Sequence, residues 1–553
     1  MPGGSDADRP PGVLDFWHPV QGQLSTRPVL LYFAFSSVYA GAMRDACLVY
    51  LGVATLSLLA SCHHEAPTRS APDGGTVLVD GSRSESASPV LRCSFPDQLL
   101  AKAVADAAVL HGIPDDQLTE LIAPGVANLT GIRCLSHLQQ LTMNAPALSD
   151  LSPLAGHPTL THLSVAESAL VNLGTLATIS HLVQLELNGK FDDPSPLASL
   201  PELTRLTLVS PNLHHLAGLG RTVKLEDLDL KNSPLDSFEG IEGAPALLMI
   251  NANAAKSTQG LHDLPKIASI YLVQSPLASI AGIERTPVLD TLFIDSTGVD
   301  SLLGMAPQPT LNDLSAGATK LTSLDGIAAA PNLTILSLTR TPILSLQGAE
   351  LLTGLRWLEI DLTQVVSLEP LAGCTQLIRL SMAGTPIVDL SPIASAASLE
   401  TLDAALTGVF NLEPLRAMTK LAYLYLGQTP VRDLGPLHGL TALTRLEIVA
   451  TQVTDLRPLS GVPISELYAD NAPIASLEGL DTGRGARILS FNGCALTSIA
   501  PIVNLPKSIL YISQNPLSAE TLQTVDQLCQ SGWNIVWDGG TCGDYCSAIG
   551  FCS

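Results

Sequence analysis

Residues 377 to 393 hold one complete copy of the pattern that decides the fold. The copy consists of Leu377-Ile378-Arg379-Leu380-Ser381-Met382, the turn Gly384-Thr385-Pro386-Ile387 and the arm Asp389-Leu390-Ser391-Pro392-Ile393. Its second leucine returns every 22 residues, at Leu292, Leu314, Leu336, Leu358, Leu380, Leu402, Leu424 and Leu446. A fixed short period is typical of a solenoid, whose units bury their apolar faces only against neighbouring units.

The same phrase extends outward in both directions, over residues 135–514. Most steps remain 22 residues, and a few shorten to 21 or 20. The further strand leucines and isoleucines are Leu141, Leu163, Leu185, Leu206, Leu228, Ile250 and Ile270 before the regular stretch, and Leu467, Leu489 and Leu510 after it. A chain of 553 residues is too long for one ordinary core, and a repeat array accounts for most of its length.

Each copy combines a short strand with a return arm. Alternate residues of a strand point to opposite faces, so Leu380 and Met382 should enter the core while Arg379 and Ser381 face out. Pro392 resists α-helix and favours a short 3₁₀ or extended arm. The pattern therefore predicts a coil with one parallel sheet along its length.

Residues 93–134 precede the repeats and have the features of a helical cap. Apolar residues between Leu99 and Leu110 follow a helical spacing, and Gly112 ends the segment. Cys93 and Cys134 flank it. In an oxidising compartment they would form a disulfide, and two unrelated buried thiols are the alternative.

Residues 515–553 should close the other end. The segment 519–528 has a helical pattern, and 533–537 is typical of a strand that covers the last turn. Four cysteines gather here: Cys529, Cys542, Cys546 and Cys552. They could bind zinc, but their spacing matches no common zinc site, so we expect no metal and two disulfides. Cys529–Cys542 with Cys546–Cys552 is one of the possible connectivities.

Residues 1–62 contain an export signal. Met43 and Arg44 precede the apolar run 46–60, which is short for a permanent membrane helix. The string Leu59-Ala60-Ser61-Cys62 resembles the lipobox of bacterial lipoproteins, which implies cleavage before Cys62 and lipidation of that residue. A transmembrane anchor with an unmodified Cys62 is the alternative. If Cys62 is lipidated, Met43 is the expected start and residues 1–42 are an upstream extension.

Residues 63–92 are rich in Ser, Pro, Gly and Asp, which indicates a flexible linker. By the same resemblance, His63 directly after the cysteine favours the outer membrane over the inner one. We therefore expect a protein of the bacterial cell envelope that is held to a membrane by its acyl chains.

Composition and charge exclude several function classes. Hydrophobic residues make up 46% and charged residues 14%, which excludes a disordered chain. The net charge of −23 repels nucleic acid. No metalloprotease motif, phosphate-binding glycine loop or nucleophile elbow is present, and the pair His214-His215 is typical of a polar surface. We expect a protein that is no enzyme and needs no cofactor.

The repeat resembles that of bacterial leucine-rich repeat proteins of the internalin type. The D-L-x-P-L return arm is complete in Asp433-Leu434-Gly435-Pro436-Leu437 and in Asp455-Leu456-Arg457-Pro458-Leu459. The resemblance implies an α/β solenoid: a right-handed coil with the parallel β-sheet on its concave face, a helical N-terminal cap and a small disulfide-rich C-terminal cap. One feature departs from the family. Its repeated asparagine after the strand is mostly replaced here, with Asn471 as an exception.

Outward strand positions gather aromatic and charged residues in the second half of the array. In a chain with 4% aromatics, such a group favours a recognition surface, because Trp, Tyr and Arg dominate binding hot spots. The alternative is that these pairs only stabilise the ladder. The candidate residues are Trp357, Glu359, Asp361, Arg379, Asp403, Tyr423, Tyr425, Arg445, Glu447 and Tyr468.

These features together predict a membrane-anchored, extracytoplasmic protein that binds a protein partner on its concave face. We expect it to be a monomer. Two other functions stay open: a structural or adhesion spacer of the cell envelope, and a regulatory subunit of a separate enzyme.

Overall fold

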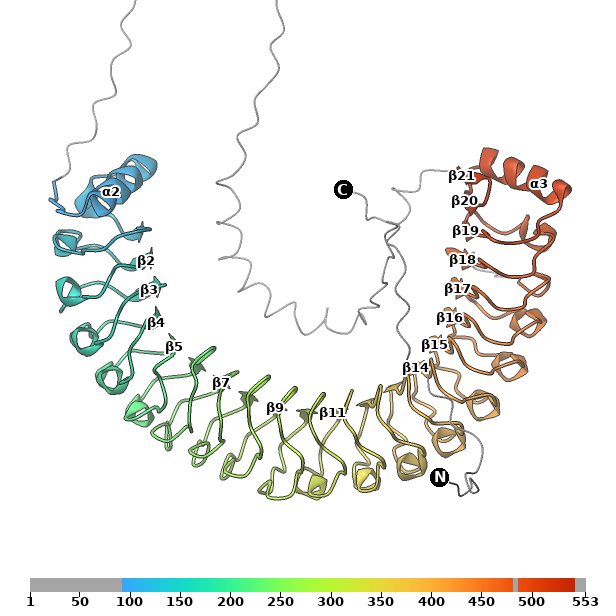
Figure 1. The fold of residues 1–553 in the computed structure, drawn as a ribbon, viewed down its shortest axis with the longest axis horizontal. Helices are drawn as coiled ribbons and strands as arrows, with labels where there is room; N and C mark the ends of the chain where they lie inside the picture. Colours follow the sequence, from blue (N-terminus) through green and yellow to red (C-terminus); the bar gives the residue numbers. More distant parts are fainter. Residues whose placement is uncertain (1–91, 481–485, 543–553) are drawn as a thin grey trace, which may run out of the picture. The chain divides into compact units, whose positions relative to one another are not determined.

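The computed structural model describes residues 92–480 and 486–542. The expected start at Met43, the lipidation site Cys62, residues 63–91 of the linker and the pair Cys546–Cys552 lie outside the described residues. The described body is a leucine-rich repeat solenoid whose strands stack along the inner side of an arc (Figure 1).

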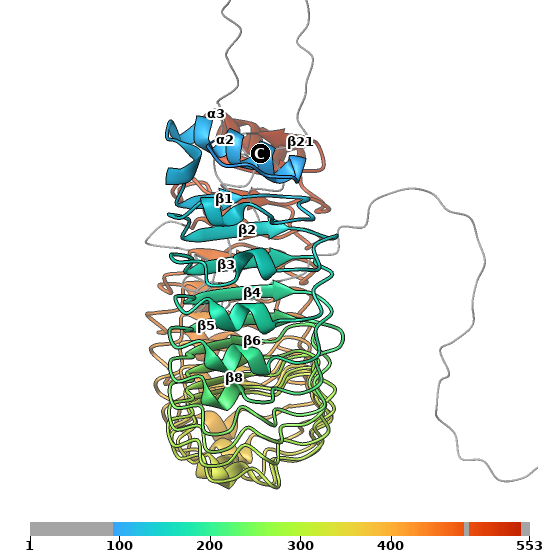
Figure 2. The ribbon, with the colours of Figure 1, turned by 90° about the vertical axis from the view of Figure 1, so that its left-hand side faces the viewer.

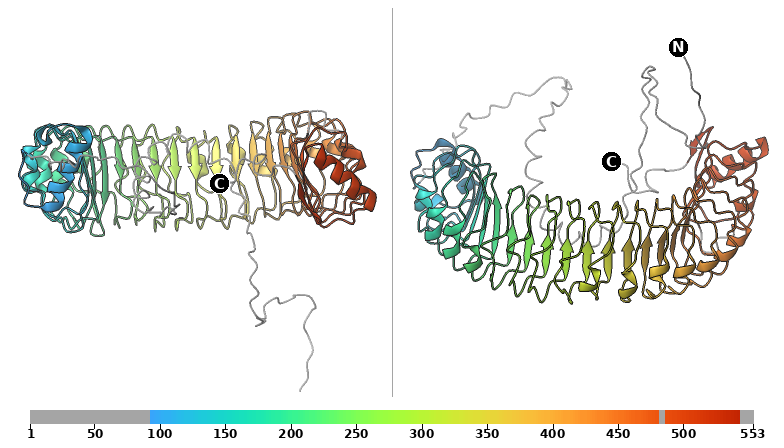
Figure 3. Two further views of the ribbon diagram at one scale, coloured as in Figure 1. Left: turned by 90° about the horizontal axis from the view of Figure 1, so that it is seen from above. Right: turned by 60° about the horizontal axis from the view of Figure 1, so that its bottom comes forward.

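A single sheet runs through the whole body, and it is parallel from β1 to β20 (Figures 2 and 3). β21 closes it in the antiparallel sense against β20. The strands are β1 Glu120–Ile122, β2 Gln140–Asn144, β3 His162–Ala166, β4 Gln184–Asn188, β5 Arg205–Val209, β6 Asp227–Asp229, β7 Met249–Asn251, β8 Ser269–Tyr271, β9 Thr291–Phe293, β10 Asp313–Ser315, β11 Ile335–Ser337, β12 Trp357–Glu359, β13 Arg379–Ser381, β14 Thr401–Asp403, β15 Tyr423–Tyr425, β16 Arg445–Glu447, β17 Glu466–Tyr468, β18 Ile488–Ser490, β19 Ile509–Tyr511, β20 Asn534–Trp537 and β21 Gly540–Cys542.

The strand leucines predicted from the period form the register of this sheet. Leu358 pairs with Leu380, and Leu380 pairs with Leu402. Every such leucine is buried, and the buried aliphatic residues form one continuous core. A one-residue slip would turn these leucines to the solvent face, so burial fixes the register.

A ladder of buried threonines supports the turns that follow β10 to β16. The Thr363 hydroxyl donates to the carbonyl oxygen of Ile360 at 2.7 Å, and Thr385 donates to Met382 in the same way. Threonine recurs there at 22-residue intervals, at Thr319, Thr341, Thr363, Thr385, Thr407, Thr429 and Thr451. Each hydroxyl adds a donor to a buried carbonyl oxygen, which in most of these turns also accepts from the backbone N–H of the same threonine.

The return arms form 3₁₀ turns on the outer side of the arc. In η10 Ser391–Ile393 the proline occupies an early helical position, and the Asp389 carboxylate accepts from the Ser391 backbone N–H at 2.9 Å. η12 Gly435–Leu437 and η13 Arg457–Leu459 repeat this arrangement. Ile393 turns inward and is buried, as the pattern predicted.

The N-terminal helix α2 spans Gln98–His111. Asp97 caps it by accepting from the backbone of Leu99 and Leu100, and Gly112 ends it in the left-handed conformation. Its buried residues are Leu100, Val104 and Ala108, four residues apart. Leu99 and Leu110 are exposed, because the buried stripe is narrower than the apolar spacing suggested.

Each cap contains one disulfide. Cys93 is bonded to Cys134, which ties the entry of the chain to the first turns. At the other end, Cys529 in α3 Ala519–Gln530 is bonded to Cys542 in β21. Neither helix in the described parts of the chain has the length and apolar character needed to span a bilayer.

Candidate binding face

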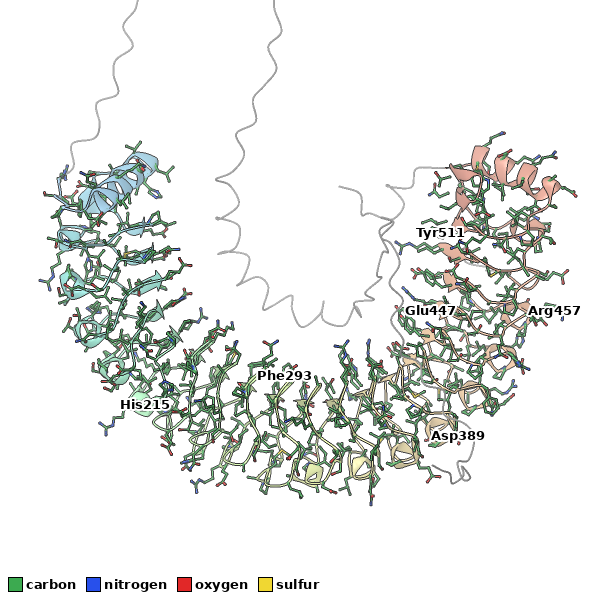
Figure 4. The ribbon with its side chains drawn as sticks, viewed as in Figure 1. His215, Phe293, Asp389, Glu447, Arg457 and Tyr511 are labelled. Atoms are coloured by element: carbon green, nitrogen blue, oxygen red, sulfur yellow. A yellow bond between two sulfur atoms is a disulfide. The ribbon has the colours of Figure 1, made fainter. Side chains whose placement is uncertain are left out.

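Each three-residue strand of the array presents two side chains on the concave side, one before and one after its buried leucine or isoleucine, and the five-residue strands β2 to β5 present three. Figure 4 shows Phe293, Glu447 and Tyr511 pointing to the inside of the arc, whereas His215, Asp389 and Arg457 lie on the outside. The predicted binding residues occupy these inner positions on β12 to β17. The exception is Asp361, which lies two residues after the end of β12. The structure therefore gathers them on one face.

Exposure on this face is lower than the sequence suggested. Of the ten predicted residues only Tyr423 is exposed, at 46%, and the others are half-buried against neighbouring strands. Ser381, which we expected to face solvent, is only 5% exposed because it lies under its neighbours and donates to Asp361. Side chains from adjacent strands, only roughly 4.8 Å apart, cover one another.

An arginine between two tyrosines forms the aromatic centre of the face. The Arg445 guanidinium carbon lies 5.5 Å from the Tyr425 ring centre and 4.9 Å from the Tyr468 ring centre. Arg445 also pairs with Glu466 at 3.0 Å. Such cation–π contacts hold the three side chains in place. The stack of Tyr425, Arg445 and Tyr468 therefore forms a rigid part of the face, and the exposed Tyr423 lies beside it.

Arg379 is the other arginine of the face, and its electrostatic pairing is incomplete. Its Nε atom lies 3.6 Å from a Glu359 carboxylate oxygen, which is an ion pair but too long for a hydrogen bond. The Nε atoms of Arg379 and Arg445 are both buried without a hydrogen-bond partner in the described residues. Buried guanidinium N–H groups normally find acceptors, so the face keeps unused donors.

Carboxylates outnumber these arginines, and burial raises the pKa of several. Burial raises the pKa of Asp403 to about 6, and the charges of Asp361 and Glu447 raise it further against the opposing effect of Arg379. Burial also raises the pKa of Asp313 to about 6, with help from Asp290, Asp295 and Glu359. Burial is also the largest cause that raises the pKa values of Glu359, Asp361 and Glu447.

Asp361 has a role within the ladder itself. Its carboxylate accepts from the Ser381 hydroxyl at 2.6 Å and from the Ala383 backbone N–H at 2.7 Å, both in the next repeat. Asp295 makes the same pair of contacts with Ser315 and Gly317, as does Asp470 with Ser490 and Asn492. The recurrence indicates a clamp between neighbouring repeats at three places.

The sequence analysis missed Asp313, Asp295 and the threonine ladder. Asp313 stands in a strand that has no aromatic residue of its own, so nothing in the local sequence marked it. The threonines were visible in the sequence at the 22-residue period, but the asparagine of the related family was the expected residue. The described residues contain no cluster of His, Cys, Asp and Glu side chains that could hold a metal ion.

The two cysteines inside the repeats are buried. Cys374 lies close to the carbonyl oxygens of Ala349 and Leu352, and burial raises the pKa of its thiol. Burial raises the pKa of Cys494 to about 11. Burial and a raised pKa are features of structural cysteines rather than of reactive ones.

Solved structures share this fold. A complex of TLR13 with ssRNA13 aligns at a TM-score of 0.52 and 15% identity, over 76% of this chain and 78% of that chain. An internalin (inlF) of Listeria monocytogenes aligns at 0.42 and 23% identity, over 64% and 95%. A leucine-rich repeat protein of Leptospira interrogans aligns at 0.45 and 17% identity, over 79% and 98%. At 15% identity the alignment with TLR13, whose TM-score is above 0.5, supports the fold alone.

Comparisons with family models and with curated proteins found no match.

Proposed function

We propose that the concave face of β12–β17 binds a protein partner that presents basic side chains. The observation that carries the proposal is the fixed stack of Tyr425, Arg445 and Tyr468 beside the exposed ring of Tyr423. Aromatic side chains held in place lose little conformational freedom on binding, which is why they dominate hot spots. Tyrosines here contribute apolar area together with hydroxyl groups for hydrogen bonds.

The carboxylates around this stack favour a basic partner. Asp403 and Glu447 lie partly out of water, and the charge of Glu447 helps to raise the pKa of Asp403, so a lysine or arginine from a partner would relieve that repulsion. Binding should weaken as salt is added, because screening reduces such attractions. The same negative charge disfavours nucleic acid on this face.

We further propose that the protein acts outside the cytoplasm, held to a membrane by a lipid on Cys62, with the outer membrane of a bacterium as the site. The string 59–62 supports lipidation, and two disulfides in the described body suit an oxidising compartment. Mass spectrometry of the membrane fraction tests this step. A full-length chain with unmodified Cys62 would refute the anchor.

Crosslinking on intact cells, followed by identification of the captured protein, tests the binding face. We expect Trp357→Ala, Tyr423→Ala and Tyr425→Ala together to lower partner recovery at least 10-fold, since hot-spot residues each contribute more than about 1 kcal/mol. The matched control is Tyr271→Ala with Phe293→Ala, an aromatic pair on β8 and β9 of the same face with ring centres 5.3 Å apart.

Equal recovery from both variants would contradict the proposed site. It would favour the second function, a structural spacer, in which aromatic and charge pairs such as Arg445–Glu466 only stabilise the ladder. Circular dichroism of each variant separates a binding defect from misfolding.

A further inference from the structure

One flank of the solenoid carries an apolar patch that the concave face does not use. It lies in the turn segments that follow β11 to β14, and its six side chains are between 49% and 63% exposed. The members of this flank patch are Leu344, Leu362, Val366, Val388, Leu406 and Phe410.

The repeat register makes these side chains neighbours. Leu344, Val366, Val388 and Phe410 follow one another at 22-residue intervals, the same interval that pairs the strands. Backbone hydrogen bonds join the same segments, from the N–H of Gln364 to the carbonyl oxygen of Ile343 and from Gly408 to Ile387. These contacts hold the four side chains in a continuous column.

Leu362 and Leu406 occupy positions whose backbone conformation and solvent exposure are both unfavourable for leucine unless another surface covers them. Both have left-handed backbones, with φ of 56° and 59°, and both are about half exposed. Leucine pays roughly 1–2 kcal/mol for this conformation. Among the described residues, the equivalent position elsewhere is held by residues such as Gly384, Gln428 or Asn471. An apolar residue in a strained, exposed position points to a surface selected for contact.

The patch side chains carry no negative charge, although the exposed Asp389 directly follows Val388. The segments 340–344, 362–366, 384–388, 406–410 and 428–432 contain no acidic residue, although the chain has 51 acidic residues against 28 basic ones. The two charged residues within them are Arg340 and Arg432, in the first and last of the five segments. Two copies of the patch can therefore bring their six apolar side chains together without burying the carboxylate of a patch residue.

We propose that the flank patch is an interface between two copies of this chain. A two-fold axis that crosses the column between Val366 and Val388 sets each of these valines against the other in the second copy, and it sets Leu344 against Phe410. Such self-complementarity is what an isologous interface requires.

The size of the patch fits this assignment. Six side chains at this exposure amount to on the order of 500 Å² of apolar surface, at the upper end for a monomer. A standard interface buries about 800 Å² per partner, so the patch would form its apolar centre. The concave face stays open in this dimer, because the patch lies on the turns that follow the strands. The dimer replaces our expectation of a monomer and is independent of the proposed partner.

The first test measures the mass of the purified full chain by sedimentation equilibrium in density-matched detergent. We expect two copies per particle at about 10–100 µM, near twice the mass that mass spectrometry gives for one copy of the same preparation. Leu344→Ser with Phe410→Ser should weaken the dimer about 100-fold. The control is Val171→Ser with Leu303→Ser, which are as exposed as the patch but lie outside it. Added salt should strengthen the dimer by screening two strongly negative bodies.

A second test places cysteines across the proposed axis. Val366→Cys and Val388→Cys chains made together in one cell should form a disulfide-linked dimer more readily than either chain made alone. A single-copy mass for the wild-type chain at 100 µM would overturn the proposal. So would equal weakening by the patch and control variants, or a captured unrelated protein on a monomeric chain.

Discussion

Replacement of Asp403 by asparagine should stabilise the protein at neutral pH. Burial is the first cause that raises the pKa of this carboxyl from 3.8 to about 6. The group therefore binds a proton more readily in the folded chain than in the unfolded one. Its contribution to stability is complete below pH 3.8 and is lost as the pH rises through about 6.

The shift of about two pKa units corresponds to about 3 kcal/mol at most. We expect roughly half of that, because water still reaches one side of the carboxyl and screens its neighbours. In the wild type, Asp403 Oδ1 accepts from the Ala405 backbone N–H at 3.0 Å. The side-chain amide oxygen of asparagine can accept the same hydrogen bond. Asp403→Asn should thus gain about 1.5 kcal/mol at pH 7.5 and almost nothing at pH 4.

Guanidinium unfolding at pH 4 and pH 7.5 measures the change, and hydrogen exchange of the β14 amides locates it within the array, since repeat proteins open locally. Asp389→Asn is the control. Hydrogen bonds from Ser391 lower the pKa of that exposed aspartate, so its replacement should not stabilise at pH 7.5. An Asp403→Asn protein that is less stable than wild type at pH 7.5, or equally changed at both pH values, would refute the reasoning.

Two further predictions concern the core. Thr363→Val should lower the free energy of unfolding by about 0.5–1.5 kcal/mol, because the buried Ile360 carbonyl oxygen loses its hydroxyl donor and keeps only the longer bond from the Thr363 backbone N–H at 3.3 Å. Thermal melting against the exposed Thr375→Val checks this, and equal melting points would contradict it. Burial is the first cause that lowers the pKa of His157, and its ring nitrogens have no hydrogen-bond partner in the described chain. The folded protein therefore favours the neutral ring, and this contribution to the free energy of unfolding is lost as the pH falls below 6.5. His157→Leu copies the residue of sister repeats at Leu200 and Leu352, and it should stabilise more at pH 5 than at pH 8; a gain independent of pH would count against this reading.

The sequence predicted the fold well because one physical requirement dominates it. Burial of a leucine such as Leu380 at every turn fixes period, register and strand direction together, and the structure confirms a leucine-rich repeat solenoid. The arms were equally predictable, since Pro392 constrains the backbone locally. Local rules act within a few residues, so they are visible in a single sequence.

The chemistry of the concave face was less predictable because it depends on neighbours one repeat away. Asp361 stood among the expected binding residues, yet its partners Ser381 and Ala383 show a clamp between repeats. Asp313 has its pKa raised by burial and by charges on other strands, none of which a local motif records. Half-burial of Tyr425 likewise depends on packing against Arg445.

The threonine ladder has a consequence for how such a protein can change length. Each hydroxyl closes on a carbonyl three residues earlier in its own turn, as Thr385 does on Met382, so a unit brings its own support with it. Whole 22-residue repeats can then be duplicated or lost by recombination between any two threonine turns, and no buried carbonyl group loses its threonine donor. The aspartate clamps tolerate this less well, and genetic gain or loss of repeats should therefore concentrate between them.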